Sequence, residues 1–126
     1  MTLLLAWNIR QGGGSRLARI AEALARQNAD ILVLSEYRGG EAATRLIASS
    51  DRLGYRHVTK LAPPPNRNGV LIASRCAFYE RGAIVNGLPE PYRMASVEFA
   101  SFRLSGLYLP DLIAKIPYWE ALIAAL

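Results

Sequence analysis

The sequence predicts a mixed α/β (α+β) fold. Short apolar runs that are typical of strands alternate with stretches in which apolar residues recur at helical spacing. The first such unit reads strand, helix, strand over residues 3–34, and a β-hairpin is expected at residues 94–109. The chain has 126 residues, of which 52% are hydrophobic and 20% charged, so it has the size and composition of one globular domain.

The first strand is predicted at residues 3–9, and its almost continuous apolar character favours a central place in the sheet. Residues 10–14 follow as a loop whose three glycines give the backbone freedom to turn. We expect Ser15 to cap a helix that ends near Gln27. One face of this helix is apolar at spacings of three and four residues, formed by Leu17, Ile20, Ala21 and Leu24.

The second strand begins near Ala29 and leads into Glu36 and Arg38. Its run Ile31–Leu34 is wholly apolar and rich in branched side chains, which predicts a strand buried on both faces. Such a strand delivers its last residues to the carboxyl edge of the sheet, where open α/β proteins place their ligands. The sequence here allows two interpretations of Glu36, a site residue or a surface ion pair with Arg38.

The middle of the chain predicts a helix at residues 41–53, with Gly54 just past its end. A strand is expected at residues 55–61, and the successive prolines of residues 63–68 require a loop. Another buried apolar strand is expected at residues 69–74, followed by an irregular or edge-like segment to residue 92.

Two strands, residues 94–99 and 102–109, alternate apolar with polar side chains and form the predicted hairpin. Pro117 suits the first turn of a final helix. The last six residues, Ala121–Leu126, are all apolar without a cap or a polar tail, from which we expect a chain cut within a larger fold.

Charge and cysteine content restrict the partners and the compartment. The net charge is +5 and thirteen of the fifteen basic residues are arginine, a side chain suited to phosphate and carboxylate. The single cysteine, Cys76, cannot form an internal disulfide and is expected to be a buried thiol, so we predict a cytoplasmic protein. No apolar stretch approaches the length of a membrane span.

Polar clusters follow three predicted strands: Asn8 with Arg10, Glu36 with Arg38, and Tyr108 with Asp111. If these strands are neighbours, an amide, a carboxylate and a phenol meet at one rim, and such oxygen ligands suit a hard cation such as Mg²⁺. A cation with arginine and tyrosine donors beside it would suit phosphodiester hydrolysis. The sequence contains no P-loop, no dinucleotide fingerprint and no nucleophile elbow, and one histidine with one cysteine makes no zinc site.

Four ordered motifs resemble the endonuclease/exonuclease/phosphatase superfamily, which includes DNA-repair nucleases of the exonuclease III type, DNase I-like enzymes and inositol-phosphate phosphatases. The first two are residues 7–10 and 30–36. They are followed by residues 68–75, which resemble the family's central strand, and by residues 93–99 with 106–110, which resemble its hairpin and tyrosine–x–proline turn.

The resemblance implies a four-layer α/β/β/α sandwich with mixed, largely antiparallel sheets, and hydrolysis of phosphoester bonds, in nucleic acid above all, by water activated by Mg²⁺ or Mn²⁺. It assigns Glu36 as a metal ligand, with Asn8 helping to order the metal, and it assigns Tyr108 to the phosphate or the attacking oxygen. Arg10, Arg38 and Arg93 are the candidate phosphate-binding residues.

Two departures from the family pattern are visible. Asp111 stands where many members have asparagine, and it could assist the metal or repel phosphate. The family's Gly-Asp-x-Asn segment and its closing Asp-His pair have no counterpart here, so we expect residues 1–126 to be the N-terminal portion of such an enzyme and nearly inactive alone. The alternative is a non-catalytic half-domain that binds a partner or forms a homodimer through an exposed sheet face, with Val70, Ile72, Val97 and Leu107 uncovered.

Overall fold

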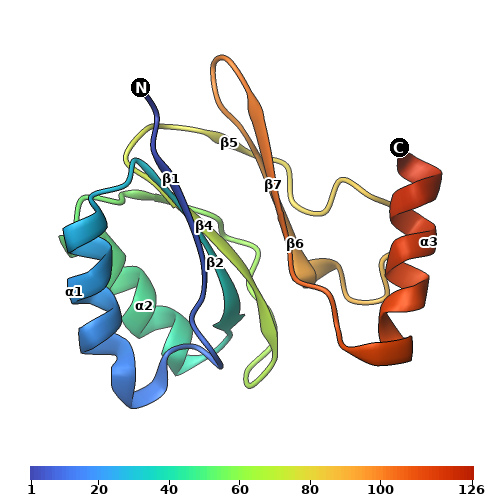
Figure 1. Ribbon diagram of the computed structural model, residues 1–126, viewed down its shortest axis with the longest axis horizontal. Helices are drawn as coiled ribbons and strands as arrows, with labels where there is room; N and C mark the ends of the chain where they lie inside the picture. The colour runs from blue at the N-terminus through green and yellow to red at the C-terminus, as the bar shows by residue number, and fades with distance from the viewer.

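The computed structural model describes residues 1–126 as four layers, helices on sheet on sheet on helix (Figure 1). Two helices, α1 (Leu17–Gln27) and α2 (Glu41–Arg52), cover the outer face of a four-stranded sheet. A three-stranded sheet packs on its other face, and α3 (Ile116–Ala125) lies beyond that second sheet. The predicted α+β sandwich is therefore confirmed.

The first sheet is mixed and has the strand order β1-β2-β4-β3. Strand β1 runs parallel to β2, whereas β4 is antiparallel to both β2 and β3. The bounds of the strands are β1 Leu4–Asn8, β2 Ile31–Arg38, β3 His57–Val58 and β4 Asn68–Ser74. The second sheet is antiparallel, with the order β5-β6-β7 and the bounds β5 Tyr79–Glu80, β6 Met94–Glu98 and β7 Arg103–Leu107.

The central strand β2 separates two cores. Leu32 and Leu34 face the helices and pack with Ile20 and Leu46, while Ile31 faces the second sheet. The same alternation along β6 and β7 directs Ala95, Val97 and Leu104 into the space between the sheets. Both faces of β2 are thus covered, as its uninterrupted apolar sequence predicts.

A third, smaller core joins α3 to the outer face of the second sheet. Tyr118 of α3 is buried against Met94 of β6 and Leu88 of the preceding loop. Pro117 lies in the first turn of α3, as predicted, and the opposite side of the helix leaves Trp119 and Ile123 exposed. No helix of the chain has the length and apolar composition needed to span a bilayer.

Several local predictions are wrong. β1 is an edge strand of its sheet with a mostly exposed surface, because apolar character alone does not say which strands flank it. Ser15 does not cap α1: a 3₁₀ turn (Gly14–Arg16) comes first, and Arg16 stands at the cap without a side-chain bond. The strand expected over residues 55–61 is reduced to His57–Val58.

Cys76 is exposed, not buried, because it follows β4 in a bend and not inside the strand. The sheet face that we expected to be open is also closed. Val70, Ile72 and Val97 are each at most 1% exposed because the two sheets of this chain cover one another, and Leu107 is half-buried beside α3.

Candidate active site

Glu36 owes its position to a β-bulge near the end of β2. The pairing of β2 with β4 shifts between Ser35 and Tyr37, so Glu36 is an extra residue with a left-handed φ of 55°. Strict alternation after Leu32 and Leu34 would direct Glu36 into the core beneath the helices. The bulge gives that place to Tyr37, which is 1% exposed, and leaves the carboxylate half-buried at the rim.

The loop after β1 wraps around Glu36. Every residue from Arg10 to Gly14 has a positive φ, a backbone shape that the three glycines make accessible. The Gln11 N–H donates to Glu36 Oε2 at 2.8 Å, and the Gly12 N–H donates to the Glu36 backbone carbonyl at 2.7 Å. Gly12 must lack a side chain, because a Cβ there would lie 2.9 Å from Arg38 Cβ.

Two side chains from other elements meet on the second carboxylate oxygen. Asn8 at the end of β1 donates from Nδ2 to Glu36 Oε1 at 3.3 Å, and Tyr108, just past β7, donates its hydroxyl to the same oxygen at 3.1 Å. The Asn8 Oδ1 accepts the Arg10 backbone N–H at 2.9 Å. The two contacts of Asn8 determine the orientation of its amide. A flipped amide would place its oxygen against the Glu36 carboxylate and its NH₂ group against the Arg10 N–H.

These contacts set the charge state of Glu36. Burial by itself raises the pKa of this carboxyl, but hydrogen bonds from the Gln11 N–H, Asn8 and Tyr108, together with the charge of Arg10, outweigh burial and lower the pKa below its usual value. Burial, then the bond to Glu36 and its negative charge, raise the pKa of Tyr108. At neutral pH the site therefore contains a carboxylate that faces a protonated phenol.

Arg93 supports Tyr108 from behind. Its guanidinium lies 5.1 Å from the centre of the Tyr108 ring, and its side chain is only 15% exposed. Arg93 Nε lies 3.4 Å from a Glu90 carboxylate oxygen, and the Tyr92 hydroxyl donates to the same oxygen. Arg93 therefore packs between Tyr108 and Glu90, and little of its side chain is exposed to solvent.

The other predicted residues are distributed unevenly. Arg10 is exposed and close enough for its charge to act on Glu36. Arg38 donates from Nε to Asn68 Oδ1 at 3.1 Å, at the start of β4. Asp111 is exposed, beyond Tyr108, and no contact brings it to Glu36. His57 pairs with Ser74 at the opposite end of β4 from Asn68.

The donor set suits a hard divalent cation. Glu36 Oε2 accepts only one N–H, so it retains a lone pair that faces no protein donor. No group of three His, Cys, Asp or Glu side chains gathers in this chain. A single carboxylate is nevertheless a common protein contribution to Mg²⁺, which keeps several waters and often binds substrate phosphate as well. The residues present therefore fit one protein ligand of such an ion.

The endonuclease/exonuclease/phosphatase family model matches residues 5–124, which include every site residue described above. The chain belongs to this family. None of the curated proteins compared with the chain matches it.

Solved structures of family members share its fold over 98% of the chain. An AP endonuclease from Archaeoglobus fulgidus superposes with a TM-score of 0.75 at 24% identity, and a 3′ phosphatase, NExo, from Neisseria bound to product DNA hairpin with 0.76 at 21%. An endonuclease/exonuclease/phosphatase from Beutenbergia cavernae gives 0.66 at 22%. The chain covers 48%, 51% and 42% of those proteins, and thus spans about half their length.

Sequence reasoning overlooked the residues that act through the backbone or from behind. The Gln11 N–H has no side-chain signature, although the glycines after it indicate a loop that must turn sharply. Asn68 stands at the start of a buried apolar strand, and because that strand runs antiparallel to β2, its start lies at the same edge of the sheet as Glu36. Glu90 lies in a segment predicted to be irregular, so no local pattern indicated its contact with Arg93.

Proposed function

We propose that this chain carries the metal-binding part of a phosphoester hydrolase that acts on nucleic acid. One observation carries the proposal: Asn8 and Tyr108, which come from separate parts of the chain, both donate a hydrogen bond to the carboxylate of Glu36 on β2. A bulge, a five-residue loop of positive φ and a partly buried tyrosine all serve to hold that carboxylate at the rim. Backbone strain of this kind is typical of functional sites.

Each residue then has a specific task. Glu36 would hold Mg²⁺ or Mn²⁺, while the Gln11 N–H and Asn8 fix the direction of the carboxylate. When bound, the cation supplies positive charge to the phosphate and lowers the pKa of water. We propose that Asn8 positions Glu36, because its amide donates to Oε1 of that carboxylate, while Asn8 Oδ1, which accepts one N–H, keeps a lone pair that could help to order the metal. Tyr108 keeps its proton and can pass its hydrogen bond from Glu36 to a phosphate oxygen.

The arginines supply charge in two ways. Arg10 and Arg38 lie at the rim beside Glu36, where we propose that they bind the substrate's phosphate. Arg93 is largely buried against Tyr108, and we propose that it positions that ring. Little of its side chain is exposed, so little of it is available for the direct phosphate contact that we predicted from the sequence. A role for Asp111 beside the metal or the phosphate stays a prediction, since its side chain is exposed and makes no contact with Glu36.

Nucleic acid is the proposed substrate class, supported by a net charge of +5 and by the family's fold. A phosphorylated small molecule is the competing substrate, because the same rim would accept any phosphate. The exposed Cys76 is compatible with the cytoplasmic location that we predict.

We further propose that full activity needs residues beyond those of this chain, which spans about half of the solved family structures. A general base and further transition-state contacts typically contribute about 10²–10⁴-fold each, so residues 1–126 alone should bind metal but cleave poorly.

Metal binding gives the direct test. Mn²⁺ titration followed by NMR line broadening should affect the amides of Gln11 and Glu36 first. Glu36→Gln should weaken the binding by more than about tenfold and Asn8→Ala by about tenfold. Glu22→Gln, an exposed change on α1 with the same loss of charge, is the matched control.

Cleavage of an abasic-site duplex and of a generic phosphodiester should be measured in parallel. Equal broadening in wild type and Glu36→Gln, or metal-dependent turnover that survives Glu36→Gln, would overturn the proposal.

The non-catalytic alternative requires a different surface from the one expected, since the inner faces of the two sheets cover one another. Leu4 and Trp7 on the free edge of β1 are 41% and 37% exposed, and a free strand edge of this kind can pair with a second copy. Sedimentation of the chain at micromolar concentration tests this: a monomer with a metal-binding Glu36 favours the hydrolase, and a dimer without metal binding favours the alternative.

A further inference from the structure

The outer face of the second sheet is only half covered. At one end, α3 packs on Met94 and Leu107, whereas the half nearer the hairpin turn has no layer over it. Two cross-strand pairs face outward there, Ser96 with Ser105 and Glu98 with Arg103, because their neighbours Ala95, Val97 and Leu104 point to the inner core. Arg103 and Ser105 are exposed, Glu98 is partly exposed, and Ser96 is buried beneath them at 3% exposure.

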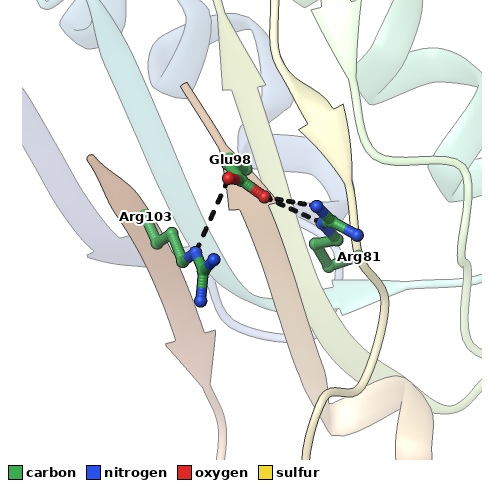
Figure 2. Close-up of polar contacts among 3 residues, drawn as sticks. All are labelled: Arg81, Glu98 and Arg103. Atoms are coloured by element: carbon green, nitrogen blue, oxygen red, sulfur yellow. Dashed lines mark hydrogen bonds and ion pairs between the residues drawn. The ribbon is translucent and has the colours of Figure 1, made fainter. Parts of the chain in front are cut away.

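Two arginines share one carboxylate on this surface (Figure 2). Arg81, one residue after β5, binds Glu98 Oε2 through Nη2 at 2.6 Å and Nε at 2.9 Å, and Arg103 Nε lies 3.7 Å from Glu98 Oε1. The three side chains together carry a charge of +1. Arg81 Nη1 and both terminal nitrogens of Arg103 make no contact with the carboxylate, so they remain available to an anion.

A cavity of about 250 Å³ opens beside these free donors. The hydroxyls of Ser96 and Ser105 lie 2.8 Å apart in its lining, and one of their two protons is left over when they bond to each other. The lining consists of Arg81, Ile84, Ser96, Val97, Arg103 and Ser105. Two guanidinium groups and a hydroxyl pair are the donors that a phosphate group requires.

An aromatic cleft of about 680 Å³ adjoins this cavity and shares Arg81 with it. Phe78, Tyr79 and Phe99 line the cleft, and Tyr79 is 72% exposed. The Arg81 guanidinium lies over this ring, 5.5 Å from its centre, yet the high exposure of Tyr79 leaves ring surface open for stacking. The volume is within the range of small-ligand sites and would admit a nucleobase.

We propose that this face is a second nucleic-acid site that binds one nucleotide of a single strand. The phosphate lies between Arg81, Arg103 and the serine pair, and the base stacks on Tyr79. Aromatic platforms next to backbone-binding arginines are the general means by which proteins hold single strands without reading sequence. Glu98 keeps the two guanidinium groups apart and aligned, which reduces the entropy lost on binding.

The site is separate from the Glu36 rim. Arg103 begins β7 and Tyr108 follows its end, so about 17 Å of extended strand lies between them. The residues also face outward, while Tyr108 reaches across to the first sheet. The inference therefore does not depend on hydrolysis, and it concerns where a strand is held and not where it is cut.

Fluorescence anisotropy with a labelled eight-nucleotide dT strand, in EDTA, measures this binding without the metal site. Arg103→Ala is expected to weaken it by about tenfold or more, the value of one charge-assisted contact, while Glu98 stays paired with Arg81. Tyr79→Ala should weaken it by about fivefold or more through lost stacking. Arg45→Ala, the same charge change on the exposed side of α2, should have little effect.

Three results would overturn the proposal. The first is equal affinity of wild type, Arg103→Ala and Tyr79→Ala. The second is tighter binding of a blunt duplex, whose bases cannot stack on Tyr79. The third comes from NMR mapping of the bound strand, if the amide shifts move at Asn8 and Glu36 and not at Ser96 and Arg103. In that last case the strand occupies the proposed active site, which leaves the hydrolase proposal intact.

Discussion

Gly106 of β7 lies where the second sheet presses on the first. A Cβ at this position would stand 2.8 Å from Val33 Cγ1 and 2.8 Å from Val70 Cγ1, whereas carbon atoms pack at about 3.5–4.0 Å. Two residues further on, the Tyr108 hydroxyl reaches Glu36 Oε1 at 3.1 Å. The absence of a side chain at Gly106 thus allows the approach that brings tyrosine and carboxylate together.

Gly106→Ala should therefore loosen the fold and the site together. Relief of both collisions needs a shift of about 1 Å, which for an overfilled core costs about 1–3 kcal/mol. The same shift would stretch the Tyr108–Glu36 bond beyond hydrogen-bond range, at about 0.5–1.5 kcal/mol for a partly exposed pair. Alanine in a strand returns about 0.5–1 kcal/mol relative to glycine. The expected net loss is about 1–3 kcal/mol.

Urea unfolding followed by fluorescence and circular dichroism measures this loss. The midpoint should fall with an unchanged m-value, and Tm should fall by about 3–5 °C for each kcal/mol in a chain of this length. Val70→Ala in the Gly106→Ala background should cost less than it does alone, because it removes one collision. Ser101→Ala, an exposed change in the hairpin turn before the same strand, is the control. A Gly106→Ala variant as stable as wild type would refute the reasoning.

Two further predictions concern stability. Burial raises the pKa of Glu36, but the bonds from Gln11, Asn8 and Tyr108 and the Arg10 charge outweigh burial, so this pKa lies below 4.5. The contribution of Glu36 to stability is therefore complete above pH 4.5 and is lost as the pH falls through the lowered pKa. Glu36→Gln should thus flatten the acid side of the unfolding free energy, and a parallel pH curve would contradict this. Tyr55→Phe leaves the buried Ala29 carbonyl without its 2.7 Å donor and should cost about 1–3 kcal/mol in urea unfolding; a cost below about 0.3 kcal/mol would argue against that bond.

Local pattern predicted the elements that bury a continuous surface of their own. The apolar run Ile31–Leu34 and the helical stripe of α1 each contain the periodicity of the structure that they form, so β2 and α1 lie close to where we expected them. β1 was misplaced because an equally apolar run can lie at an edge, and its exposure depends on neighbours that no local pattern specifies.

The sequence by itself determined the layer order, the family and the candidate residues Asn8, Glu36 and Tyr108. These follow from the order of four motifs along the chain, which can be read without knowing any contact. Only the tertiary structure decided how those residues meet. Glu36 and Tyr108 are 72 positions apart, and their bond depends on a bulge in β2 and on the close packing at Gly106. A hydrogen bond between distant residues reflects the positions of whole strands, and those positions follow from the packing of both sheets together.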